Sequence, residues 1–140
     1  MAAKDKYHEH VKEALMKDGW TITHDPYVIK FGKDKEKYEV DFGAEKIIAA
    51  QKGTQKIAIE VKSFLSGSVL YDYHAALGQY LNYKINLDEF EADRILFIAM
   101  PQPAYKLLSK KKLAMKTVEK LTLKIFTFDI EKREIVQWIK

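Results

Sequence analysis

The segment KIAIEVKSF (residues 56–64) determines how the fold is interpreted. Its apolar residues alternate, which is typical of a β-strand. The apolar face would consist of Ile57, Ile59 and Val61, and the opposite face of Ala58, Glu60 and Lys62. The two charged residues then lie side by side, about 7 Å apart at their Cα atoms. They are either ordinary polar residues of an outer strand face or part of a catalytic group.

The surrounding sequence alternates between helical and extended patterns. Helices are predicted over 5–17, 69–84 and 103–120, and strands over 20–23, 27–31, 38–42, 47–51, 94–100, 123–128 and 135–139. A turn at 52–55 would join the strand before it to the segment 56–62 as a hairpin. This order predicts one domain over residues 1–140, an α/β fold built around a mixed sheet.

Composition limits the classes of function. The chain has 140 residues, a net charge of +4 and no cysteine, which excludes disulfides, thiolate nucleophiles and cysteine-based zinc sites. No apolar run approaches the ~18 residues that a membrane span needs. The first ten residues are charged and resemble no signal segment. We therefore expect a cytoplasmic protein, and the basic excess suits an anionic partner such as DNA.

Asp41 provides a second carboxylate for the group at Glu60 and Lys62. In the predicted strand 38–42 it projects away from its apolar neighbours Val40 and Phe42. If the strands are adjacent, Asp41 and Glu60 converge and could bind Mg²⁺ or Mn²⁺ through oxygen ligands. Lys62 could then orient the attacking water or stabilise the charge that develops during phosphodiester hydrolysis. The alternative is a charged outer face on which cross-strand pairs are common.

This arrangement of Asp41 and E-x-K resembles the PD-(D/E)XK nuclease superfamily. The resemblance implies a restriction-endonuclease-like fold, in which a mixed β-sheet is flanked by helices and the acid and E-x-K lie on adjacent strands. The sequence departs from the pattern in one respect, because Val40 and not proline precedes Asp41. Glu45 is a second candidate for the first acid and metal ligand, since it lies closer to the predicted hairpin.

Gln79 and Tyr83 are four residues apart on the predicted helix 69–84, so they share one flank of it. This Q-x-x-x-Y spacing resembles a motif of nuclease branches related to RecB. The resemblance implies that both residues support the active site and contact DNA. The alternative is a tyrosine on a partly buried helix edge with an incidental glutamine.

Longer blocks resemble the XisH family, the fdxN element excision controlling factors. They are KDGWTITHDP (17–26), VDFGAEKIIAAQKG (40–53), KIAIEVKSF (56–64), ALGQYLNY (76–83) and QWI (137–139). The resemblance implies control of the site-specific excision of a DNA element in cyanobacteria. It also implies a partner protein, XisI, and a separate recombinase on which the factor acts indirectly.

Two hypotheses follow from these observations. The residues favour a metal-dependent DNA endonuclease or nickase, which suits a homodimer because two active sites match two DNA strands. The family description favours a regulatory factor without catalysis that binds DNA or a partner. The lysines at 106, 110–112, 116 and 120 either contact the DNA backbone or form a solvated helix end. His8 is expected at the surface, and Asp25 in a turn.

Overall fold

The computed structural model describes residues 5–30, 36–49 and 53–140. Within these ranges, six strands form one mixed sheet in the order β1-β4-β5-β6-β7-β8. They are β1 (Thr21–His24), β4 (Phe42–Ala49), β5 (Gly53–Val61), β6 (Arg94–Pro101), β7 (Ile125–Asp129) and β8 (Glu134–Ile139). The central strands β5, β6 and β7 are parallel, and the outer strands pair antiparallel to their neighbours.

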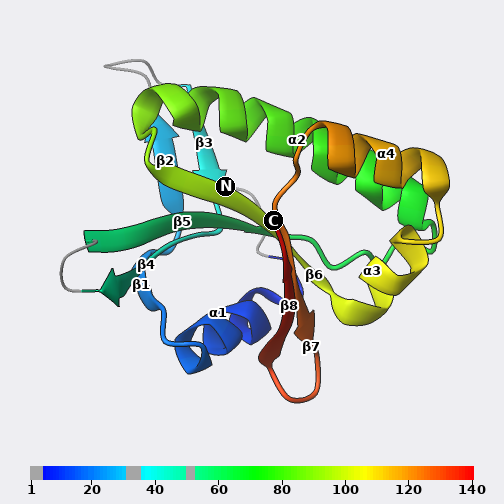
Figure 1. Ribbon diagram of the computed structural model, residues 1–140, viewed down its shortest axis with the longest axis horizontal. Helices are drawn as coiled ribbons and strands as arrows, with labels where there is room; N and C mark the ends of the chain where they lie inside the picture. Colours follow the sequence, from blue (N-terminus) through cyan, green and yellow to red (C-terminus); the bar gives the residue numbers. More distant parts are fainter. Residues whose placement is uncertain (1–4, 31–35, 50–52) are drawn as a thin grey trace.

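Helices cover both faces of this sheet (Figure 1). One face carries α1 (His8–Lys17), and the other carries α2 (Val69–Phe90), α3 (Gln102–Leu108) and α4 (Lys112–Lys120). Each face has its own apolar core, which we call the α1-side core and the α2-side core after the helix that contributes to it. The predicted α/β class, a mixed sheet flanked by helices, is confirmed.

The strand β5 separates the two cores, because its side chains alternate between the faces. Ile57, Ile59 and Val61 belong to the α1-side core, and Ala58 belongs to the α2-side core. Glu60 therefore follows Ala58 on the α2 side, at the carboxyl end of the strand. The predicted division of this segment into two faces is confirmed.

The segment 38–42 is not the continuous strand that the alternation predicts. Val40 is fully buried in the α2-side core, and Phe42 is fully buried in the α1-side core. The chain must cross from one face of the sheet to the other between these two residues, so it bends at Asp41. Alternation alone could not predict this bend, because an apolar residue looks the same whichever core receives it.

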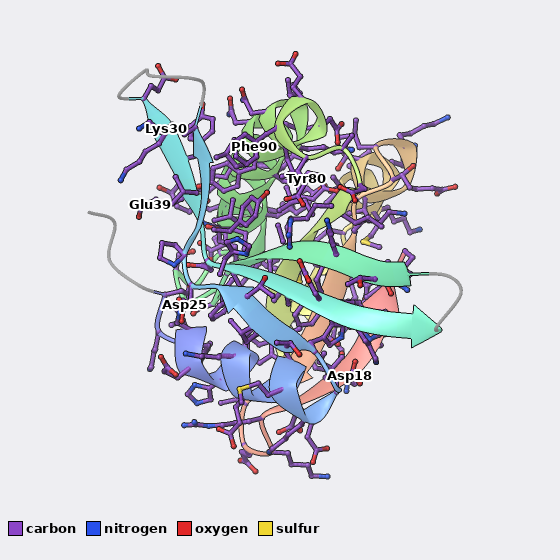
Figure 2. All side chains as sticks on the ribbon, turned by 90° about the vertical axis from the view of Figure 1, so that its left-hand side faces the viewer. Asp18, Asp25, Lys30, Glu39, Tyr80 and Phe90 are labelled. Carbon is purple, nitrogen blue, oxygen red and sulfur yellow. The ribbon has the colours of Figure 1, made fainter. Side chains whose placement is uncertain are left out.

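The residues before the bend form a separate two-stranded sheet. β2 (Tyr27–Lys30) pairs antiparallel with β3 (Lys37–Val40). Figure 2 shows this pair standing beside the end of α2, with Lys30 and Glu39 on the strands and Phe90 on the helix. The small sheet therefore closes one end of the α2-side core.

Two helix predictions need correction. The helix predicted over 69–84 continues to Phe90, because Leu87 extends its buried face by a further turn. The helix predicted over 103–120 is two helices, α3 and α4, separated at residues 109–111. The Ser109 hydroxyl donates to the Lys106 carbonyl there and satisfies a backbone group at the end of α3. No helix in the described ranges is long and apolar enough to span a membrane.

The hairpin before Glu60 also differs from the prediction. β4 begins at Phe42 and not at residue 47, and residues 53–55, predicted as turn, belong to β5. Residues 50–52 lie outside the described residues. The other predicted elements agree with the structure to within three residues at either end.

Candidate active site

Asp41 and Glu60 meet at the carboxyl end of β5. The pairing of Phe42 with Ile59 places Asp41 beside Glu60 on the neighbouring chain segment. The Val61 amide donates to Asp41 Oδ2 at 2.7 Å, and the Asp41 amide donates to Glu60 Oε1 at 3.3 Å. These reciprocal bonds hold both carboxylates at the bend, as the convergence of the two strands predicts.

Lys62 lies directly after β5 and completes this group. Its Nζ atom is 3.3 Å from Glu60 Oε2, and its amide donates to the Ala99 carbonyl at 2.9 Å. The lysine side chain is 24% exposed, whereas that of Glu60 is 11% exposed. The ammonium therefore contacts the buried glutamate and is the more exposed of the two charged groups.

The two carboxylates repel each other when both are ionised. Burial, and secondly the charge of Asp41, raise the pKa of Glu60 to about 8, although Lys62 opposes this shift. Burial also raises the pKa of Asp41, against the bond from the Val61 amide. A buried acid beside a partly buried one disfavours the state in which both are ionised, and a bound cation would relieve that repulsion.

The structure brings Tyr83 to this group but not Gln79. Tyr83 is 8% exposed, and burial followed by the charges of Glu60 and Asp41 raises its pKa to about 12. Its ring also lies 5.3 Å from the ring of Tyr38. Gln79 is exposed on α2. The tyrosine of the Q-x-x-x-Y motif therefore faces the carboxylates, while the glutamine faces solvent.

Glu45 does not join the carboxylate pair. It lies opposite Lys56 on β5, four residues before Glu60, which corresponds to about 13 Å along the strand. Its Oε1 atom is 3.5 Å from Nη2 of the buried Arg94. Of the two candidates for the first acid, the structure places Asp41 beside Glu60.

His8 lies against this site, and its predicted surface position is wrong. The side chain is 4% exposed, with Nε2 2.9 Å from Asp25 Oδ1 and Nδ1 3.6 Å from Asp41 Oδ1. Figure 2 shows Asp25 beside α1, so the predicted turn residue reaches the helix and not only its own backbone. The signal was present in the sequence, because His8 precedes the buried Val11 and Leu15 at helical spacing.

Asp5, which precedes α1, forms hydrogen bonds with Ser63, the residue after Lys62. Its carboxylate accepts the Ser63 amide at 3.1 Å and also the Ser63 hydroxyl. A hollow of about 340 Å³ adjoins these contacts, and Lys6, Lys62 and Phe64 are among the residues that line it. Sequence reasoning did not predict this contact, because 58 residues separate Asp5 from Ser63.

Asp41 and Glu60 are the residues that could hold a metal ion. Within the described ranges, no group of three or more His, Asp or Glu side chains is arranged for this purpose. Mg²⁺ often binds proteins through one or two carboxylates and keeps several waters, so a pair of acids fits it. Burial, and secondly the charge of Asp41, raise the pKa of Glu60, and a bound cation would offset both effects.

Comparisons with known proteins agree with one another. The family model described as "XisH protein" matches residues 1–136. A crystal structure of an XisH family protein from Nostoc punctiforme is 36% identical, covering 97% of this chain and 100% of that one, with a TM-score of 0.83. A structure of an fdxN element excision controlling factor from Anabaena variabilis is 39% identical, covering 98% and 100%, with a TM-score of 0.83. A search of curated proteins found no match.

Proposed function

Because the chain belongs to the XisH family, we propose that it acts in the control of DNA-element excision. The relative from Anabaena variabilis is named as such a controlling factor. We further propose that Asp41, Glu60 and Lys62 form a site for metal-dependent cleavage or nicking of DNA. One observation carries this proposal: a buried carboxylate, a partly buried one and a lysine meet at the end of one strand. The resemblance to PD-(D/E)XK nucleases points the same way.

The chemistry follows from the position of each group. A bound Mg²⁺ or Mn²⁺ would polarise the phosphoryl oxygen and lower the pKa of a coordinated water. Asp41 and Glu60 would hold the ion. Lys62 is placed to orient the attacking water or stabilise the charge on the phosphate. Tyr83 is buried in the α2-side core, close enough to the two acids for their charges to raise its pKa.

DNA can approach from the lysine side of the pair. The hollow of about 340 Å³ is lined by Lys6 and Lys62, which offer two cations to phosphate oxygens, and by Asp5 and Asp72, which accept the amides of Ser63 and Ser66. All of the lysines on α3 and α4 and between them are exposed, at 106, 110–112, 116 and 120. If these lysines contact the DNA backbone, binding should weaken steeply as the salt concentration rises.

A regulatory factor without catalysis is the second candidate. The observation that favours it is the internal use of both acids, since Val61 and Asp41 amides already bond their oxygens. Such a cluster can serve as a clamp between the bend at Asp41 and β5. The protein would then bind DNA or an XisI-like partner and bias a recombinase toward excision.

A cleavage assay distinguishes the two candidates. Supercoiled, branched and single-stranded DNA are incubated with the protein and Mg²⁺ or Mn²⁺, with and without the XisI-like partner. We expect Glu60→Gln and Lys62→Met to lower the cleavage rate by about 10²-fold or more. Glu45→Gln is the matched control, because it alters a neighbouring acid outside the pair. Equal cleavage by wild type and both site variants, or none at all, would overturn the nuclease proposal.

Metal binding provides a readout that does not depend on catalysis. Mg²⁺ should raise the melting temperature of the wild-type protein and leave that of Asp41→Asn unchanged. Glu60→Gln should also be tested for DNA-element excision in cells. Normal excision by this variant, with folding and partner binding intact, would favour the regulatory candidate.

A further inference from the structure

The outward side of α2 is uncharged over most of its length. Lys, Arg, Asp and Glu make up 31% of the sequence, yet none projects from the outward side of this helix from residue 70 to residue 86, and Lys84, at the edge of that side, pairs with Asp88 at 3.0 Å. The exposed residues there, which we call the α2 outer face, are Leu70, Tyr71, His74, Ala75, Gly78, Gln79, Asn82, Ile85 and Asn86. α2 is the outermost layer on its side of the sheet (Figure 1). Depletion of charge around exposed aromatic residues is typical of the centre of a protein interface.

Gly78 lies at the middle of the α2 outer face. At 100° per residue it points almost directly away from the buried Tyr80 and Leu87. A Cβ atom at this position would meet no atom of the described residues within 4 Å, so packing within the chain does not require glycine. Glycine destabilises an exposed helix interior relative to alanine. Its presence is explained if the backbone of another molecule approaches closely at this point.

Two large apolar side chains flank Gly78 symmetrically. Tyr71 lies seven residues before it and is 69% exposed, and Ile85 lies seven residues after it and is 65% exposed. Residues seven apart share one stripe of a helix. If two copies of α2 cross antiparallel at Gly78, Tyr71 of each copy meets Ile85 of the partner subunit. The contact is then self-complementary, as a two-fold interface requires.

We propose that the α2 outer face binds a second copy of this chain, antiparallel, with the two-fold axis at Gly78. Charge supports this direction, because Glu89 is exposed at the far end of the same stripe, eleven residues after Gly78. In the antiparallel pair it reaches the N-terminus of the partner subunit's α2, where a negative charge is favourable. DNA would not suit this face, because none of its residues is a cation and Lys84 at its edge is already paired with Asp88. The proposal is independent of whether the site at Glu60 cleaves DNA.

Cysteine cross-linking tests the axis and the direction, because the chain has no cysteine of its own. Under mild oxidation, Gly78→Cys should form a disulfide-linked dimer, since the two Cα atoms approach each other at the axis. Tyr71→Cys alone and Ile85→Cys alone should not, but an equimolar mixture of the two should. Glu131→Cys, at an exposed turn between β7 and β8, is the control for random collision. Cross-linking of Gly78→Cys no faster than this control would overturn the proposal.

The mass in solution provides the second test. One helix pair is small beside the ~800 Å² per partner of standard interfaces, so we expect a dimer at tens of micromolar protein. Gly78→Lys should be monomeric in sedimentation and at least as resistant to heat as the monomeric wild type, because lysine favours helix over glycine. A wild-type monomer at 100 micromolar or above would overturn the proposal. The proposal would also be overturned if Gly78→Lys has the same mass in solution as wild type but no longer binds DNA.

Discussion

Replacing Glu60 with glutamine should make the protein more stable at high pH. The wild-type carboxyl has a pKa of about 8 in the folded chain and about 4.5 when unfolded, because it is buried beside Asp41. The folded protein therefore holds a proton that the unfolded chain releases, and stability falls as the pH rises between these values. Glutamine cannot ionise, and its amide oxygen can still accept the Asp41 amide.

The magnitude follows from the width of this pH window. Each pKa unit corresponds to about 1.4 kcal/mol, so a window of about 3.5 units sets a ceiling of ~5 kcal/mol. Asp41 shares the repulsion, and the variant loses the charge contact with Lys62, so we expect roughly half of this. Glu60→Gln should gain ~2–3 kcal/mol in free energy of unfolding over wild type at pH 8, and little at pH 4.5. Urea titrations from pH 4.5 to 8 with a chelator present measure both curves.

A control with the opposite sign is available in Glu13. Its pKa is lowered, chiefly by the hydrogen bond from Arg133, so its contribution to stability is present at neutral pH and lost as the pH falls. This change lies below about pH 4.5, so from pH 4.5 to 8 Glu13→Gln should differ from wild type by a nearly constant amount, while Glu60→Gln gains stability over wild type across the same range. If the Glu60→Gln and wild-type curves stay parallel from pH 4.5 to 8, the carboxylate repulsion inferred at this site is wrong.

Two further predictions concern the contacts that hold the small sheet and β4 together. In Gly43→Ala the new Cβ would lie 2.8 Å from His24 Nδ1 and 2.9 Å from a Tyr27 ring carbon, so unfolding free energy should drop by about 1–3 kcal/mol. A loss below ~0.5 kcal/mol in thermal melts would contradict this. Arg94→Met removes a buried guanidinium bonded to Glu91 at 2.7 Å and should cost about 3 kcal/mol. If Arg94→Met has the same free energy of unfolding in urea as wild type, other contacts hold the small sheet and β4 together.

The alternation of apolar and polar residues was sufficient to predict the strand that carries Glu60. Residues 56–61 have one apolar face with no interruption, and both neighbours of β5 belong to the same sheet. The segment 38–42 alternates equally well but divides between two sheets. Each of its apolar side chains could be buried in either core, so the position of the bend is visible only in the folded chain.

His8 illustrates the limit for single residues. Its helical spacing from Val11 and Leu15 indicates burial, but nothing in the neighbouring sequence reveals that Asp25 and Asp41 will lie beside its two ring nitrogens. Those two acids are 17 and 33 residues away along the chain. Contacts at this separation depend on how β1 and β4 pair beneath α1, which sequence periodicity does not encode.

The sequence by itself determined the family, the α/β class and the placement of Glu60 on the strand face that carries Ala58, because these depend on local motifs and on strand alternation. Only the tertiary structure showed that Asp41 lies beside Glu60, whereas Glu45 lies opposite Lys56, about 13 Å away along β5. It also separated Tyr83 from Gln79, since one faces the carboxylates and the other faces solvent. Strand pairing and helix rotation fix these positions, and both arise from packing across the whole chain.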